Sequence, residues 1–129
     1  MAKHHSPGTV APPLSRYSHA VEAPAGARWL HVSGQVGIKP DGSLAAGLEA
    51  QMEQAWRNIL AILKAADMDP ADLVKVTGFL VAGSADVALY RDVRDRVLGS
   101  ARPASTLLIV AGLARPEYLV EIEAIAAAD

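Results

Sequence analysis

The last quarter of the chain constrains the fold most, because it holds two apolar runs of strand length joined by a short turn. The runs cover residues 105–110 and 119–125. In the second run, aliphatic side chains alternate with Glu121 and Glu123. This period of two places both carboxylates on one face of a strand and the aliphatic side chains on the other. A solvated sheet face explains the two glutamates simply, and a functional site is the alternative.

Length and composition limit the class of protein. The 129 residues are enough for one domain with a real core but too few for two. A net charge of −2 without a basic stripe provides no surface for nucleic acid or an anionic membrane. Cysteine is absent, which excludes disulfides, thiolate metal sites and a cysteine nucleophile. No apolar run reaches the roughly 20 residues that span a bilayer, and no signal-peptide core is evident. We therefore expect a cytoplasmic protein.

The N-terminal residues 1–14 contain three prolines and show no periodicity. They are predicted to form a flexible arm, followed by one domain over residues 15–129. His4 and His5 are adjacent in this arm. Two neighbouring histidines in a mobile tail are usually incidental, so no metal site is expected.

Two short strands are predicted next, at residues 15–22 and 28–32. A Pro/Gly segment separates them, and this arrangement predicts a hairpin. The strongest helical pattern follows over residues 48–68, where apolar side chains recur at i, i+4, i+7 and i+8. Met52 and Trp56 lie within that stripe, so they are predicted to pack in the core rather than to bind a cofactor.

A β-rich segment at residues 74–82 is predicted to be a central strand. Gly78 within it indicates a bulge or a close backbone approach. A second helix is predicted from about residue 85 to 98, with Val93 or Arg94 on its inner stripe and Gly99 just past its end.

The predicted order of elements is therefore β-β-α-β-α-β-β. Such alternation favours an α+β fold, in which one mixed sheet carries both helices on one face. The other sheet face must then be wet or must cover a partner. Apolar residues on both faces of segments 79–81 and 107–109 favour a partner, and a homo-oligomer would bury them.

Four short stretches in the same order resemble the RidA (YjgF) family of enamine/imine deaminases. They are Tyr-Ser-His-Ala-Val at 17–21, Val-Ser-Gly-Gln-Val at 32–36, Pro-Ala-Ser at 103–105 and Val-Glu-Ile-Glu-Ala-Ile-Ala at 120–126. The resemblance runs from about residue 15 to residue 127. Each motif alone is weak, but four in the right order are specific.

The resemblance implies a chorismate-mutase-like fold and a homotrimer with three small-molecule clefts at its subunit interfaces. Members of the family hydrolyse reactive 2-imino or 2-enamino acids to keto acids and release ammonia. They use neither a metal nor an organic cofactor. The expected partners are therefore other copies of the chain and a small-molecule ligand.

Carried over residue by residue, the family's water-positioning glutamate falls on Glu121, the expected catalytic residue. The cleft tyrosine falls on Tyr17, and the turn that lines the cleft falls on Ser33 and Gly34. The family's arginine, which holds the substrate carboxylate as a bidentate pair, does not carry over. Ser105 occupies its position.

Ser105 supplies one hydroxyl donor and no charge. A charge-assisted hydrogen bond is worth roughly 1.5–3 kcal/mol, so we expect carboxylate binding to weaken at least tenfold. Thr106 offers a second hydroxyl contact. Arg91 lies near a helix-two asparagine of the family and could replace the lost charge, although a solvated helix face explains it more simply.

Two functions remain open at this point. The first is a deaminase of the same chemistry acting on a changed imine or enamine substrate. The alternative is a non-catalytic trimer that binds or senses a small metabolite. RNA cleavage is disfavoured, because the chain has a net charge of −2 and only six aromatic residues.

Overall fold

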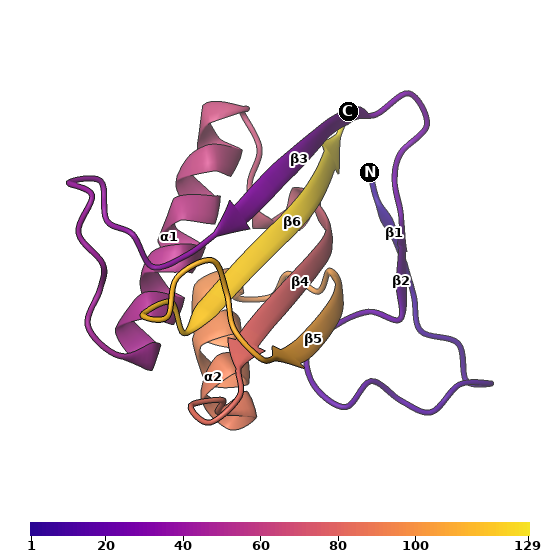
Figure 1. Ribbon diagram of the computed structural model, residues 1–129. Coiled ribbons are helices and arrows are strands. Elements are labelled where there is room, and N and C mark those ends of the chain that lie inside the picture. The colour runs from indigo at the N-terminus through magenta and orange to yellow at the C-terminus, as the bar shows by residue number, and fades with distance from the viewer.

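A four-stranded mixed sheet with two helices on one face forms the body of the computed structural model, which describes residues 1–129 (Figure 1). In spatial order its strands are β3 (Arg28–Gln35), β6 (Val120–Ala128), β4 (Leu73–Val81) and β5 (Ala104–Val110). The helices are α1 (Leu48–Ala65) and α2 (Val87–Leu98). The predicted α+β class, with both helices on one face, is confirmed. We call the face without helices the open face.

Strand β6 has the alternation that the sequence predicts. Val120 and Ile122 are fully buried against the helices, whereas Glu121 is half-buried and Glu123 is exposed on the open face. This strand lies between β3 and β4 and pairs antiparallel with both. Strands β4 and β5 are parallel and are joined by α2. The last strand of the sequence is thus an interior strand of the sheet.

The predicted hairpin between residues 15–22 and 28–32 is wrong. Strand β2 (Ala20–Glu22) pairs instead with β1 (Lys3–His5), a strand that the sequence analysis did not place. Strand β3 pairs with β6, because its inward side chains Leu30 and Val32 reach the core only from that position. The two-stranded β1–β2 ribbon stands beyond the open face, on the side away from the helices (Figure 1).

The core lies between α1 and the sheet. Met52 and Trp56 are completely buried there, so the prediction that they pack in the core is confirmed. Helix α1 ends at Ala65, three residues before the predicted end. It stops early because Asp67 adopts a positive φ of 54° and the chain then turns Met68 inward. Neither helix is long and apolar enough to cross a membrane.

Helix α2 has clear signals at both ends. The Asp86 carboxylate accepts a hydrogen bond from the backbone nitrogen of Leu89 at 3.0 Å, a standard N-cap. Gly99 ends the helix with a φ of 61°, as predicted. Arg96 joins α2 to α1 by pairing with Glu49 at 3.1 Å and with Glu53 at 2.7 Å.

Gly78 marks a close approach, but not a bulge. Strand β4 is regular there, and its irregularity lies between Leu73 and Lys75. A Cβ atom at Gly78 would lie 2.6 Å from Cζ of Tyr90, so the glycine gives room to a side chain of α2 rather than to another backbone. This contact fixes where the hydroxyl end of Tyr90 lies.

Candidate functional site

The site residues predicted from the sequence fall into two groups on opposite faces of the sheet. Tyr17, Arg91 and Ser105 line one cavity on the helix side. Ser33, Gly34 and Glu121 gather on the open face. Thr106 belongs to neither group.

The first group lines a cavity of about 150 Å³ between α2, β5 and the N-terminal residues 14–15. We call it the α2–β5 cavity. Its other lining residues are Tyr17, Tyr90, Arg91, Arg94, Ser105 and Leu107. Two guanidinium groups and two phenols line this space, and no carboxylate does.

The sequence explains why these side chains meet. On β5, Leu107 packs against the core beneath α2, and Ser105 points the same way because alternate residues of a strand share a face. On α2, Tyr90 and Arg94 are four residues apart and therefore lie on the same side of the helix. Arg91 lies beside them, half-buried. Tyr17 is brought in by the bridge between Ser18 and Ala104, which places residues 17–18 beside the start of β5.

Tyr90 carries a buried hydroxyl with no partner. Its side chain is 1% exposed, and its Oη atom makes no hydrogen bond within the chain. Burial raises the pKa of Tyr90 to about 12, although the nearby Arg94 cation acts in the opposite direction. The phenol therefore remains protonated at neutral pH and is available as a donor.

Arg94 is a cavity residue that the sequence motifs did not single out. It is only 4% exposed. Its Nε donates to Oδ1 of Asp95 at 3.1 Å, and its Nη2 lies 3.0 Å from the same oxygen without forming a hydrogen bond. Asp95 is shared, because Arg16 also approaches it at 3.8 Å. The sequence did contain one indication of this residue. Arg94 falls on the predicted inner stripe of the second helix, where a buried arginine is rare unless it is paired.

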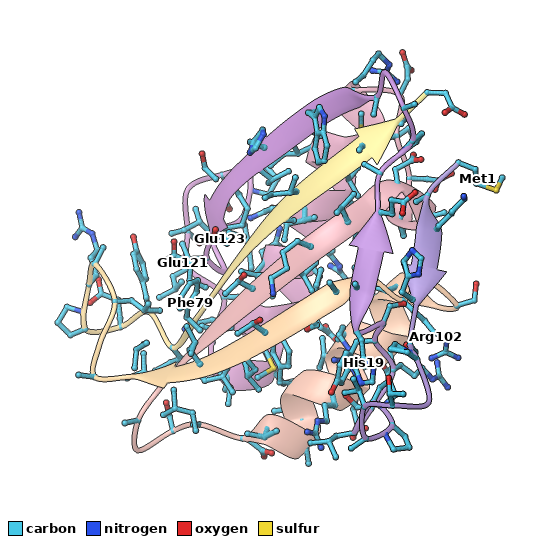
Figure 2. All side chains as sticks on the ribbon, turned by 90° about the vertical axis from the view of Figure 1, so that its right-hand side faces the viewer. Met1, His19, Phe79, Arg102, Glu121 and Glu123 are labelled. Carbon is cyan, nitrogen blue, oxygen red and sulfur yellow. The ribbon has the colours of Figure 1, made fainter.

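The second group depends on an irregularity in β3. One extra residue lies between Val32 and Gln35, opposite a regular stretch of β6, so Ser33 and Gly34 form a β-bulge. A Cβ atom at Gly34 would come within 2.8 Å of Cδ of Glu121. The glycine thus lets the carboxylate lie directly against the bulge. Figure 2 shows Glu121, Glu123 and Phe79 together on the open face.

Thr106 also points to the open face, where its hydroxyl accepts a hydrogen bond from Nζ of Lys75. Its neighbour Ser105 points into the α2–β5 cavity. The structure thus separates the two hydroxyls that the sequence analysis considered together as ligand contacts.

The two groups are too far apart to hold one small molecule within a single chain. Ser105 and Ala124 both lie opposite Val76 of β4, and Glu121 is three residues further along β6. Two strand spacings across and three residues along give roughly 14 Å between backbone positions. The sheet itself lies between the cavity and the carboxylate. One small molecule therefore cannot contact both groups within a single chain.

A larger cavity of about 590 Å³ lies near β1 and includes His4, Ser18 and Arg102. The Ser18 hydroxyl donates to the carbonyl oxygen of Arg102 at 2.7 Å, and Nδ1 of His4 lies 2.8 Å from the same hydroxyl. These contacts attach β1 to the domain. No group of three or more metal-ligating side chains is present.

Comparison with known proteins identifies relatives over almost the whole chain. The model of the family described as endoribonuclease L-PSP matches residues 8–128. A RutC family protein of Pyrococcus horikoshii is 35% identical over 116 residues, which cover 88% of each chain. The 2-iminobutanoate/2-iminopropanoate deaminase of Mus musculus is 34% identical over 123 residues, covering 94% of this chain and 84% of that protein.

The fold is also shared with solved structures. A protein of unknown function of the conserved Rid family, YyfB from Yersinia pestis, superimposes with a TM-score of 0.87 over 98% of both chains, at 32% identity.

Proposed function

Because the chain belongs to the endoribonuclease L-PSP family, and its relatives include 2-iminobutanoate/2-iminopropanoate deaminases, we propose that it hydrolyses a small imine or enamine. The reaction takes place in a cleft that two copies of the chain complete. One copy contributes Glu121 with the Ser33–Gly34 bulge, and its neighbour contributes the α2–β5 cavity.

The separation of the two half-sites carries this proposal. A carboxylate that can orient water lies on the open face, and a cavity rich in donors lies on the helix side, roughly 14 Å away by strand spacing. Neither half is sufficient for hydrolysis of a bound imine. A second copy that places its open face near the first copy's cavity brings water, carboxylate and substrate together.

The open face has the apolar surface that such an assembly needs. Trp29 is 54% exposed and Leu108 is 45% exposed, and both point to that face. They lie on the two edge strands, β3 and β5, so exposed apolar surface extends across the sheet, and such surface is typical of an interaction site. We propose that the copies form a closed trimer, in which this face is buried in every copy.

The chemistry required of the chain is modest. The Glu121 carboxylate accepts a hydrogen bond from a water molecule and directs its oxygen at the C=N carbon. The water oxygen bonds to that carbon, and the π electrons move to nitrogen. After proton transfer to nitrogen, the C–N bond breaks and releases ammonia and a ketone. One imine and one water thus give one carbonyl compound and one ammonia.

Ammonia release tests this proposal directly. We expect the wild-type chain to accelerate ammonia release from 2-iminopropanoate generated in situ, and Glu121→Gln to lose most of that acceleration. Glu123→Gln is the matched control, because Glu123 lies two residues along the same strand on the same face. It should retain the activity.

No acceleration with a panel of imines would overturn the hydrolase. If a small carboxylic acid then still raised the melting temperature without being consumed, the chain would be a metabolite-binding trimer instead. Equal losses in the two glutamate variants would show that Glu121 has no special role.

A further inference from the structure

We infer that Arg94 of α2 is the anion anchor of this site, and that with Tyr90 it holds the carboxylate of the substrate in the α2–β5 cavity. The inference rests on the proposed function for the identity of the ligand. The choice of anchor rests on the burial and hydrogen bonding of the two residues.

The guanidinium of Arg94 has hydrogen-bonding capacity that the chain does not use. It carries five N–H donors, yet its hydrogen bonding within the chain is limited to the bond from Nε to Asp95. Buried charged groups are normally paired and fully hydrogen-bonded, because transferring a charged group from water into the protein interior costs free energy. Although Nη2 also lies 3.0 Å from Oδ1 of Asp95, the remaining N–H groups have no partner within the chain, and a guanidinium beside a cavity can bind a carboxylate in two places.

Tyr90 adds a second unused donor at the same cavity. Its buried Oη has no partner, and Gly78 gives its ring the room to lie against β4. The unpaired phenol and the partly used guanidinium line the same small cavity, and a buried polar group without a partner is unusual in a native structure. One ligand with paired acceptor oxygens satisfies both.

The charge around the cavity supports an anion rather than a neutral ligand. Arg91 and Arg94 line the cavity and no carboxylate does, while Asp95, the ion-pair partner of Arg94, is shared with Arg16. Ser105, on the opposite wall, contributes no charge. Its short side chain leaves open the space into which a longer residue at this position would project.

Arg91 is the other candidate for the anion anchor, and it is less deeply buried than Arg94. It is half-buried, so water already solvates its guanidinium in part. A charge-assisted hydrogen bond is stronger where water is excluded. We therefore assign the main contact to Arg94 and a weaker, supporting contact to Arg91.

Binding of pyruvate tests the anchor without any need for turnover. Pyruvate is a stable keto acid with a carboxylate, and its amide, pyruvamide, has the same shape without the charge. We expect pyruvate at millimolar concentration to raise the melting temperature of the wild-type chain, and pyruvamide to have little effect. Arg94→Gln should raise the dissociation constant for pyruvate about tenfold or more. Arg57→Gln, on the exposed face of α1, is the charge-matched control and should bind like wild type.

The stability of the ligand-free chain separates an anchor from a structural residue. If Arg94 is kept for binding, Arg94→Met should change the melting temperature of the ligand-free chain little, because Asp95 is partly exposed and keeps a second cation, Arg16, beside it. If the Arg94–Asp95 pair instead supports the fold, the same variant should melt clearly earlier. Early melting together with unchanged pyruvate binding by Arg94→Gln would overturn the inference, as would the absence of any pyruvate effect on wild type.

This result is distinguishable from failure of the proposed function. Arg94-dependent pyruvate binding in a chain that releases no ammonia would overturn the hydrolase and leave the anchor in place. Ammonia release with an unchanged KM in Arg94→Gln would do the reverse.

Discussion

Mixing two inactive variants gives the sharpest test that the site is shared between copies. Ser105→Phe fills the α2–β5 cavity with a ring but leaves Glu121 intact, and Glu121→Gln removes the carboxylate but leaves the cavity open. Each variant alone should be nearly inactive. If the two half-sites come from different copies, subunits refolded together will form some interfaces in which both contributing halves are wild type.

The recovered activity can be calculated from the geometry. With equal amounts and random assembly, half of the copies carry an intact Glu121 and half carry an open cavity. A ring in which each interface takes one half-site from each neighbour therefore has about one quarter of its sites intact, whatever the number of subunits. We expect about 25% of wild-type ammonia release.

The control mixture pairs Glu121→Gln with Gly34→Ala. A Cβ atom at Gly34 overlaps the Glu121 carboxylate, so both variants damage the same half-site and no interface can be repaired. Recovery in the first mixture but not in the control supports the shared site. If the first mixture is no more active than its two components, the complete site lies within one chain and the reasoning is refuted.

Four further outcomes follow from the structure. Gly78→Ala should lower the free energy of unfolding by roughly 1–3 kcal/mol, because the added methyl group overlaps Tyr90. Gly112→Ala is the control, because no atom lies near its added Cβ, and it should change the free energy of unfolding little in the same urea titration. The contribution of Tyr90 to stability should be constant below pH 10. It should be lost between pH 10 and 12, by at most about 1.4 kcal/mol per pH unit, because the phenol ionises near 10.0 in the unfolded chain and only near 12 in the folded one. Tyr90→Phe should reduce this loss. Arg96→Ala should lower the melting temperature slightly, and the loss should shrink in 1 M salt, since both of its ion pairs are solvent-exposed. Ser105→Arg should weaken pyruvate binding, because a third guanidinium fills the cavity and repels Arg91 and Arg94; tighter binding would contradict this account.

Much of the fold could be predicted from local patterns. The period of two in β6 and the apolar stripe of α1 each depend on residues close together in sequence, and Gly99 marks the end of α2 as expected. Strand pairing was predicted less well. The hairpin assigned to residues 15–22 and 28–32 was wrong, because β3 completes the core only beside β6, a partner about ninety residues away in sequence that no local pattern indicates.

The candidate site shows a similar limit. Glu121 and the Ser33–Gly34 turn were found through short motifs, and the structure does bring them into contact. Of the six predicted substrate contacts, the structure brings three together in one cavity, Tyr17, Arg91 and Ser105, and leaves the other three on the opposite face, Ser33, Gly34 and Thr106. Arg94 could not be selected from the sequence. Its burial beside the cavity, with most of its N–H groups unpaired, is visible only once α2 is packed against the sheet.

The position of β6 also determines when this protein can fold. This strand joins β3 to β4 in the interior of the sheet, yet of the four strands of this sheet it is the last to be synthesised. Until then, β3 has no partner and β4 has one unpaired edge, and such edges favour pairing with other chains. The sheet can therefore form only after β6 (Val120–Ala128) has been synthesised, and the pairing of segments distant in sequence predicts slow folding for a domain of this size. A nascent chain stalled just before residue 119 would expose the edges of β3 and β4 that later pair with β6. A chaperone that shields these edges is most useful at that moment.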